Sequence, residues 1–203
     1  MAKVHPLTST SIDSVSATTS RGESFTIWMK SLLMQANGCT VYNQKGEIVY
    51  RIDNYDHKNS KQVYLMDLQG KVLFTILRKK ISVFRRWEGY KSNESNPNGD
   101  DHKPFFEVTK SCKVIGKDVC CKVTINSDNA EASYYRLEAL AGKSTLRIID
   151  SEGRLVAEAK RKQSSSGVVL GDDVLTLVIE QDVQDHSLIM ALVTVYGLIR
   201  YKM

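Results

Sequence analysis

The sequence predicts a mainly β fold, an antiparallel β-barrel of about twelve strands that encloses one hydrophobic C-terminal helix. One observation is the uncharged run 188–199, which is too long for a buried strand and too short for a membrane span of roughly 20 apolar residues. A helix that is apolar on every side must be covered on every side. The other observation is a hairpin pattern that the preceding chain repeats. Closing such hairpins into a barrel hides the helix and removes the sheet edges.

Residues 1–22 are rich in Ser and Thr and poor in large apolar side chains, so we expect a flexible tail. The tail lacks the apolar region of a signal peptide and the glycine of a myristoylation site. We expect the folded domain to occupy residues 23–203 and its first strand to lie at Ser24–Trp28. No shift in composition within that range predicts a second domain.

Three segments carry the same hairpin pattern, in which two β-rich runs flank a turn that ends in glycine. The segments are 38–55, 62–80 and 144–162, with turns at Asn43–Gly46, Asp67–Gly70 and Asp150–Gly153. An Asp or Asn at the first position bonds to the backbone ahead of it, and the glycine adopts the left-handed conformation. We therefore expect three bulged hairpins with positive φ at each glycine.

The remaining strands are predicted from apolar runs between turn signals, at 81–90, 104–110, 118–125, 134–140 and 173–180. In Val72–Leu77 large apolar residues occur at both parities, which indicates a strand covered on both faces. In Thr145–Ile149 apolar and polar residues alternate more regularly, which indicates a strand with one solvent-exposed face. The polar stretches 92–103 and 164–167 are predicted to be exposed loops.

The last element is predicted to be a helix at Asp185–Tyr201. The β-branched residues Val193–Val195 favour a strand locally, but the length of the apolar run favours a helix. Asp185 can accept hydrogen bonds from the first backbone N–H groups. Arg200 and Lys202 place positive charge near the C-terminal end, where the helix dipole favours it.

Composition narrows the class of protein only slightly. Of the 203 residues, 42% are hydrophobic and 25% are charged, as in an ordinary globular domain. The net charge of +5 permits an anionic partner without requiring one. The cysteines lack CxxC spacing and fit reduced thiols: Cys39, Cys112, Cys120 and Cys121. We therefore expect an intracellular, cytoplasmic protein without a transmembrane segment, and the nucleus and the periphery of the plasma membrane stay open as locations.

No motif of a catalytic or cofactor site is present, since the chain lacks GxSxG, Walker A, GxGxxG and HExxH. Cys120 and Cys121, being adjacent in a strand, point to opposite faces and cannot chelate one ion together. Asp172 and Asp173 diverge in the same way. The histidines occupy positions typical of solvated side chains: His5, His57, His102 and His186. We predict a non-enzymatic protein with no catalytic residue, no metal and no cofactor.

Positive charge gathers in three places. Seven basic residues between positions 71 and 91 stand against one acid, Glu88: Lys71, Arg78, Lys79, Lys80, Arg85, Arg86 and Lys91. Lys160–Lys162 form a second cluster, and a looser third one consists of Lys110, Lys113, Lys117 and Lys122. One interpretation is a solvated barrel rim. The other is a groove for a phosphorylated headgroup, to which each Lys or Arg contributes about 1 kcal/mol.

The candidate headgroup residues are the densest cations, Arg78, Lys80, Arg85 and Arg86. Strand alternation places Arg78 and Lys80 on one face, where two charges can bind one phosphate group. Trp87 beside them fits either a membrane interface or the core. A nucleic-acid-binding protein would have longer basic runs or a recognisable reading module, so we expect no specific nucleic acid partner.

Several segments carry, in order, a family resemblance: 27–33, 38–42, 48–55, 65–67, 70–71, 76–80, 170–177 and the helix 185–201. Together they resemble the plant LURP-one-related family. The resemblance runs from Ser24 to the end of the chain. It implies the fold shared by the C-terminal domain of Tubby proteins and by phospholipid scramblases, a β-barrel around a central hydrophobic helix. The family's namesake is linked to plant defence against an oomycete pathogen.

Functional residues of those related proteins are not transferred by the resemblance. The phosphoinositide-binding residues of Tubby proteins have no matched positions here, and the chain lacks the cysteine-rich tail and calcium loop of scramblases. We expect a non-enzymatic binding protein that engages anionic phospholipids such as phosphoinositides, or a protein partner, in plant defence signalling. The alternative is a protein-only scaffold or regulator without lipid binding. A ligand-sequestering barrel fits least, because the helix fills the interior.

Overall fold

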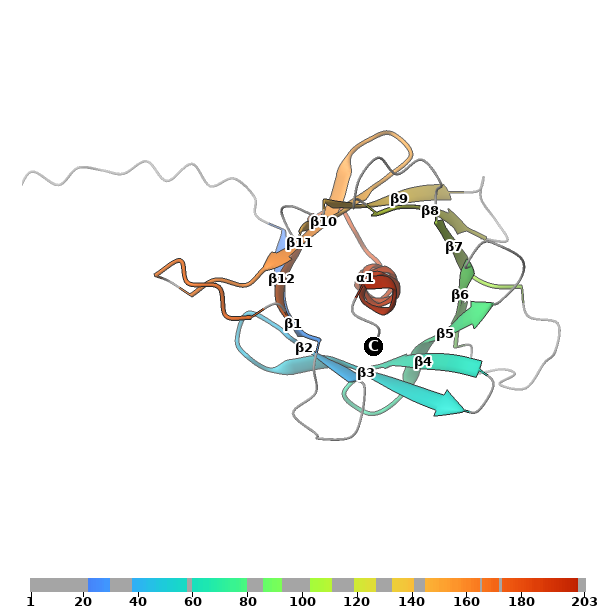
Figure 1. Cartoon of the computed structure of the whole chain (residues 1–203), viewed down its shortest axis with the longest axis horizontal. Helices are drawn as coiled ribbons and strands as arrows, with labels where there is room; N and C mark the ends of the chain where they lie inside the picture. Colours follow the sequence, from blue (N-terminus) through green and yellow to red (C-terminus); the bar gives the residue numbers. More distant parts are fainter. Residues whose placement is uncertain are drawn as a thin grey trace, which may run out of the picture.

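The computed structural model describes residues 22–29, 38–57, 60–79, 86–92, 103–110, 119–126, 133–140, 145–164, 166–171 and 173–200. Figure 1 looks down a closed β-barrel with α1 at its centre. This confirms the predicted fold class. The predicted tail, residues 1–22, lies outside the described residues apart from Gly22, as does the first half of the predicted strand 81–90.

Twelve strands and one helix make up the described elements. They are β1 (Glu23–Trp28), β2 (Gly38–Tyr42), β3 (Ile48–His57), β4 (Ser60–Met66), β5 (Val72–Lys79), β6 (Arg86–Lys91), β7 (Phe106–Lys110), β8 (Val119–Ile125), β9 (Ser133–Leu140), β10 (Thr145–Ile149), β11 (Leu155–Arg161), β12 (Val174–Ile179) and α1 (His186–Arg200). Each strand is antiparallel to the next in sequence, and β1 pairs with β12 from Glu23↔Ile179 to Trp28↔Val174. The chain thus leaves no open sheet edge among these strands.

The core forms between the inner face of the barrel and α1. Alternate strand residues point inward, and Phe74 and Ile76 of β5 are 0% exposed. The outward-facing side chains of β5, Leu73 and Leu77, are only half-buried. The outer face of β5 is therefore less covered than the sequence predicted, which was a strand covered on both faces. Every residue of α1 from Leu188 to Leu198 is buried. The helix therefore fills the space that the barrel encloses (Figure 1).

The helix begins where the sequence predicts, at an Asp185 cap. The Leu188 backbone N–H donates to Asp185 Oδ1 at 3.0 Å, and the Ser187 hydroxyl donates to the same oxygen. Burial alone would raise the pKa of Asp185, but these bonds and the Lys91 ammonium outweigh burial and hold the pKa below its usual value. The buried Thr194 hydroxyl donates to the Met190 carbonyl at 2.8 Å, so the helix satisfies its own polar side chain.

The three predicted turns have the expected geometry. Gly46, Gly70 and Gly153 have φ of 79°, 80° and 84°. At the first residue of each turn, a side-chain oxygen accepts from backbone N–H groups two and four residues ahead. A register shift next to each turn marks the bulge.

A fourth hairpin turn lies where the sequence predicted only an exposed loop. The Gly167 N–H donates to the Ser164 carbonyl at 2.9 Å, and Gly167 has φ of 80°. The Ser164 hydroxyl takes the role of the Asp or Asn side chain, accepting from the Val168 N–H at 3.1 Å. The prediction missed this turn because it required Asp or Asn at the first position.

The two ends of the barrel differ. At the turn end lie the three turns with Gly46, Gly70 and Gly153 and the start of α1. Here His186 Nδ1 is 3.2 Å from Glu23 Oε2 and Lys91 Nζ is 3.1 Å from Asp185 Oδ2. At the other end, which we call the mouth, β5, β7 and β11 finish and α1 terminates at Arg200. Because neighbouring strands are antiparallel, the C-terminal end of every odd-numbered strand lies at the mouth.

Replacing Leu192 by Asp should unfold the domain. Leu192 is 0% exposed on α1, and an unpaired buried charge costs several kcal/mol against a total stability of about 5–15 kcal/mol. Thermal and urea melts followed by circular dichroism measure the effect. The same change at Leu68, which is 56% exposed, is the control and should leave the melt unchanged. A cooperative Leu192→Asp melt near that of the parent would contradict the central-helix arrangement.

Replacing Gly70 by Val should lower the free energy of unfolding by at least about 1 kcal/mol, because an L-residue with a Cβ is strained in the left-handed region. No atom lies within 4 Å of a Cβ built at Gly70, so the loss comes from backbone conformation alone. Gly70→Asn should cost less, since Asn tolerates this region. Equal stability of the Gly70→Val variant and the parent in urea melts would show that the left-handed turn contributes nothing.

Candidate functional site at the mouth of the barrel

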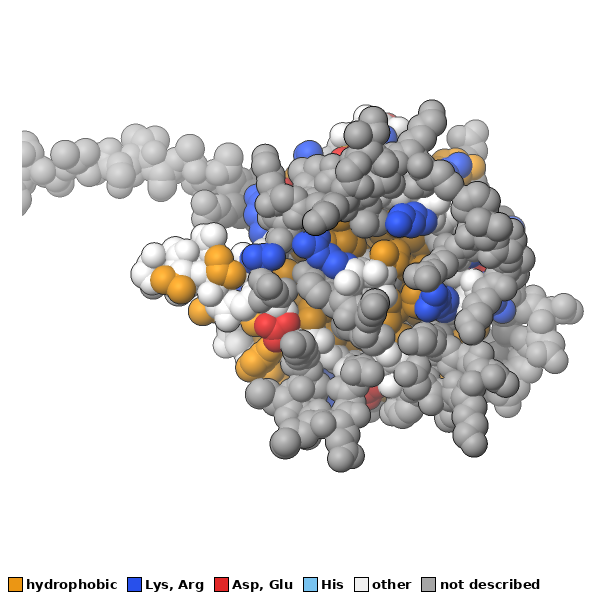
Figure 2. All heavy atoms as spheres, viewed as in Figure 1, with side chains coloured by type: hydrophobic (Ala, Val, Ile, Leu, Met, Phe, Trp, Pro, Cys, Tyr) orange, Lys and Arg blue, Asp and Glu red, His pale blue; other side chains and the backbone are white. Residues whose placement is uncertain are grey.

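Cations line the mouth because several strands end in a basic residue of inward parity. Arg78 continues the inward series of Phe74 and Ile76, and Lys110 that of Phe106 and Val108. Arg161 follows Ala157 and Ala159 in the same way, and α1 ends at Arg200. We call Arg78, Lys110, Arg161 and Arg200 the basic mouth. Figure 2 shows Lys and Arg side chains spread around an area of hydrophobic side chains in this view down the barrel.

Arg78 is held by stacking and not by an ion pair. Its guanidinium carbon lies 5.7 Å from the centre of the Trp87 ring, and the two residues are direct partners across β5 and β6. Trp87 is 4% exposed, so the ring belongs to the core. Arg78 Nε is buried without a hydrogen-bond partner, and no carboxylate among the described residues pairs with the guanidinium. Stacking of this kind orients the guanidinium and leaves its donors available to an anion.

Lys110 approaches from the other side of β6. It is exposed, pairs across the sheet with Cys121, and has no ion-pair partner in the part of the chain that the structure describes. Burial raises the pKa of the Cys121 thiol to about 11, and the charge of Lys110 opposes that shift. With β6 between them, β5 and β7 lie roughly 10 Å apart. Arg and Lys side chains are long enough to reach one anion across that gap.

The end of α1 contributes the fourth cation. Arg200 Nη1 donates to the Tyr196 hydroxyl at 2.7 Å, and its guanidinium carbon lies 5.9 Å from the centre of that ring. The C-terminal end of a helix carries partial negative charge, which stabilises cations placed there. Part of the positive charge of the mouth is therefore balanced by α1 itself.

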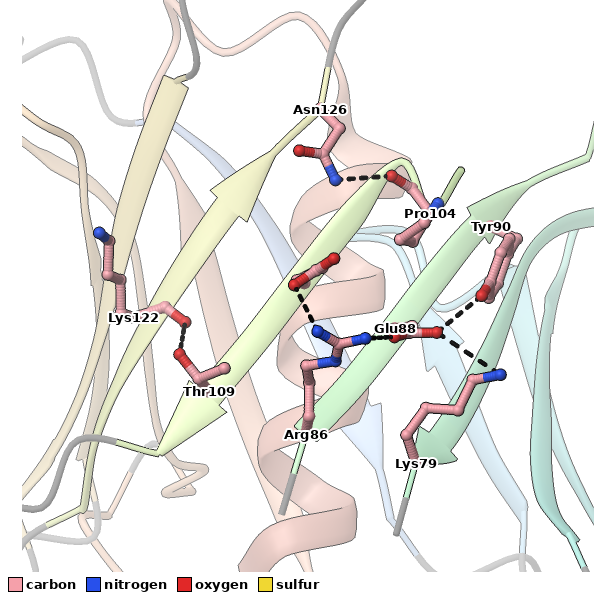
Figure 3. A network of polar contacts seen from close by, with 9 residues as sticks. Lys79, Arg86, Glu88, Tyr90, Pro104, Thr109, Lys122 and Asn126 are labelled. Carbon is pink, nitrogen blue, oxygen red and sulfur yellow. Dashed lines mark hydrogen bonds and ion pairs between the residues drawn. The ribbon is translucent and has the colours of Figure 1, made fainter. Parts of the chain in front are cut away.

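A second cluster lies on the outer wall of the barrel and is internally neutralised. Glu88 on β6 is only 3% exposed, and its carboxylate pairs with Arg86 and lies 3.7 Å from Lys79 Nζ. Arg86 Nη1 also lies 3.3 Å from Glu107 Oε2. Figure 3 shows Arg86, Lys79 and Tyr90 converging on Glu88, with the Tyr90 hydroxyl donating at 2.6 Å. Two cations thus face two carboxylates.

The hydroxyl of Tyr90 is an unusually weak acid in this network. Burial and the hydrogen bond to Glu88 raise the pKa of Tyr90 to about 12. The phenol therefore keeps its proton and stays a donor throughout the physiological range. The cluster holds β5, β6 and β7 together on their outer face, since buried charges that are paired and hydrogen-bonded are stable in place.

The structure separates the two described members of the predicted headgroup cluster. Arg78 pairs with Trp87 across the sheet and points inward, whereas Arg86 pairs with Lys79 and points outward. Lys80 and Arg85 lie outside the described residues, so their place in the site stays a prediction. The sequence interpretation left Lys110, Arg161 and Arg200 out of the site. Lys110 and Arg161 continue the inward parity of their strands, and Arg200 ends the buried helix, so these positions could have identified them.

The cysteines and histidines take separate positions. Cys39 and Cys121 are buried, Cys120 is half-buried on the opposite face of β8, and all three are free thiols. Burial raises the pKa of Cys39 far above its usual value, which leaves an unreactive thiol. Cys112 lies outside the described residues. The residues that the structure describes contain no group of three His, Cys, Asp or Glu side chains placed to hold a metal ion.

No helix in the described ranges has the length and hydropathy needed to cross a membrane.

Comparison with known proteins identifies relatives over nearly the whole chain. "Protein LURP-one-related 11" of Arabidopsis thaliana is 43% identical and aligns with 98% of this chain and 89% of its own length. "Protein LURP-one-related 4" is 44% identical over 98% of this chain and 87% of its own length. An X-ray structure of an Arabidopsis thaliana protein superposes with a TM-score of 0.60 at 12% identity, covering 88% of this chain and 91% of that one. That structure supports the fold alone.

The family model described as LURP-one-related matches residues 23–197, from the first residue of β1 into the last turn of α1. With this match and plant relatives above 40% identity, the chain belongs to the LURP-one-related family.

Proposed function

We propose that this protein is a non-enzymatic binding domain that engages phosphorylated anionic lipid headgroups, such as those of phosphoinositides, at the basic mouth. The domain would span residues 23–203, with residues 1–22 as a flexible tail. The observation that carries the proposal is Arg78. Its guanidinium faces inward, stacks on Trp87 and lacks a carboxylate partner within the described residues.

Electrostatics favour the mouth over the outer wall. Arg86 and Lys79 already face Glu88 and Glu107, so a phosphate at the outer wall would compete with these two carboxylates for the same donors. At the mouth, Arg78 and Lys110 have no such competitor among the described residues. A phosphate monoester or diester accepts several hydrogen bonds, and a planar guanidinium can donate two of them in parallel.

The filled interior also favours a ligand that binds at the surface. A barrel that holds a small molecule needs an empty centre, and here the eleven successive residues from Leu188 to Leu198 are buried against the wall. A lipid headgroup meets this requirement, because it projects from a membrane and needs only a cationic surface. In plant defence signalling, with which the family's namesake is linked, such a domain would bring its partners to a membrane.

The double substitution Arg78→Gln and Lys110→Gln should weaken binding to vesicles that carry multiply phosphorylated inositides by roughly 30-fold. Each cation near an anionic surface contributes about 1 kcal/mol, and a tenfold change in affinity corresponds to about 1.4 kcal/mol. Binding of the parent should fall steeply as salt is raised, since the contacts are exposed and screened. Vesicle sedimentation at a series of salt concentrations measures both effects.

The control is Arg51→Gln, which removes one positive charge from an exposed arginine of β3 that is paired with Asp53 at 3.8 Å. This variant should bind as the parent does. If the parent ignored inositide vesicles and soluble inositol phosphates at low ionic strength, the headgroup proposal would fail. The protein-only scaffold or regulator would then take its place.

A further inference from the structure

The chain between β11 and β12 forms a short hairpin that leaves the barrel wall. The Lys162 N–H donates to the Val174 carbonyl at 2.8 Å, and the Leu170 N–H donates to the Lys162 carbonyl at 3.0 Å. Gln163 and Val169 pair in an antiparallel bridge beyond them. We call residues 163–171 the projection. Figure 1 shows it extending sideways from β11 and β12, away from the rest of the barrel.

The projection exposes consecutive aliphatic side chains. Val168 is 63% exposed, Val169 43% and Leu170 54%. Successive residues of an extended chain point to opposite faces, so the returning strand of the projection presents apolar side chains on both of its faces, while the 164–167 turn is polar. The other large apolar side chains exposed in the described ranges stand singly in sequence: Ile48, Leu68 and Tyr134. Scattered single residues are normal on a surface, but a contiguous exposed apolar segment indicates an interaction site.

Positive charge lies directly beside this apolar segment. Lys160, Arg161 and Lys162 precede it, and the acids nearest in sequence are Glu158 before them and Asp172 and Asp173 after Gly171. Lys162 Nζ is fixed on the wall by donation to Thr26 Oγ1 at 2.6 Å, and Lys160 Nζ lies 2.6 Å from Glu158. The projection also starts from the mouth end, where Arg78 and Lys110 lie. In Figure 2, hydrophobic side chains lie on the projection beside polar and backbone atoms, and Lys and Arg side chains lie between it and the centre of the barrel.

We propose that the projection is a membrane-insertion element, whose Val168, Val169 and Leu170 enter the interfacial region of an anionic bilayer. Aliphatic side chains gain free energy when they leave water, while the cations behind them gain by staying at the level of the lipid phosphates. An apolar strand beside three consecutive cations, Lys160–Lys162, matches a bilayer whose interior is apolar and whose surface is anionic. The inference rests on the proposed function and deepens it, because it adds an apolar anchor to the headgroup site.

Vesicle binding by a variant with Val168, Val169 and Leu170 all changed to Ser tests the anchor. The vesicles contain phosphatidylcholine and phosphatidylserine and no phosphoinositide, so that they report insertion independently of the headgroup site. The full chain should sediment with them, and the triple variant should bind roughly tenfold or more weakly, because burial of several methyl and methylene groups is lost. Leu68→Ser at the opposite end of the barrel should bind as the parent does. Melting temperatures of all variants check that the fold is kept, which the exposure of these positions predicts.

A depth measurement identifies the inserting segment directly. Val169→Trp places a reporter on the projection, and Leu68→Trp places one at the turn end. With phosphatidylcholine brominated on its acyl chains, emission of the Val169→Trp protein should be quenched well beyond that of the parent, which carries Trp28 and the buried Trp87. Emission of the Leu68→Trp protein should be quenched no more than the parent's.

The outcomes separate this inference from the proposed function. If the parent binds soluble inositol phosphate but the triple-Ser variant sediments as well as the parent, or the Val169→Trp emission is not quenched, the insertion element is wrong and the headgroup site stands. If insertion occurs but Arg78→Gln with Lys110→Gln leaves inositide binding unchanged, the headgroup site is wrong and the insertion element stands. A parent that binds no vesicle of either kind overturns insertion and leaves the projection as a surface for a protein.

Discussion

The burial of α1 on all of its sides is the constraint on which the rest of the structure depends. Each fully buried Leu, Ile or Val side chain contributes about 1.5–3 kcal/mol, but only if every direction around the helix is closed to water. A sheet with two open edges could not supply that cover, whereas a barrel closed by the pairing of β1 with β12 does. The barrel in turn has no core of its own, because the helix occupies the centre. Helix and wall therefore stabilise one another, and neither has an independent hydrophobic core.

The same constraint directs where chemistry can occur. With the interior occupied, polar side chains gather on the outer wall and at the two ends. On the outer wall Glu88 is buried among Arg86, Lys79 and Tyr90, and its charge is matched locally. At the mouth the strands end in cations that face inward, and Arg78 rests on the Trp87 ring without a carboxylate partner in the described ranges. On the wall Arg86 and Lys79 face carboxylates, whereas at the mouth Arg78 and Lys110 face none in the described ranges. This contrast distinguishes a structural cluster from a candidate binding surface.

Much of the fold could be predicted from the sequence because its signals are local. The Asp185 cap, the turn glycines and the apolar run of α1 each act within a few residues, and all appear as predicted. The β-branched run at Val193–Val195 favoured a strand locally, but in the structure it forms part of α1 and is buried. The turn at Ser164 was missed because a serine hydroxyl, in place of an Asp or Asn side chain, accepts the hydrogen bond from the backbone N–H there.

The candidate site was predictable only in part, because it depends on partners across strands. Nothing within the basic run indicates that Glu107 of β7 would also bind Arg86, or that Arg78 and Arg86 would face opposite ways. The parity of Arg78 was visible in the alternation of β5. Its isolation from carboxylates was not, since that follows from the registers of β5 with β6 and β6 with β7.

Native-state hydrogen exchange of the α1 amides tests most directly whether helix and barrel form one cooperative unit. The account predicts that the amides from Leu192 to Leu198 exchange only through global unfolding. Their exchange free energies should then equal those of central amides in β5 and β12 and the unfolding free energy from urea melts. Exchange of these α1 amides at a clearly lower free energy, while the strand amides stayed protected, would contradict it, because the barrel would then persist without its helix.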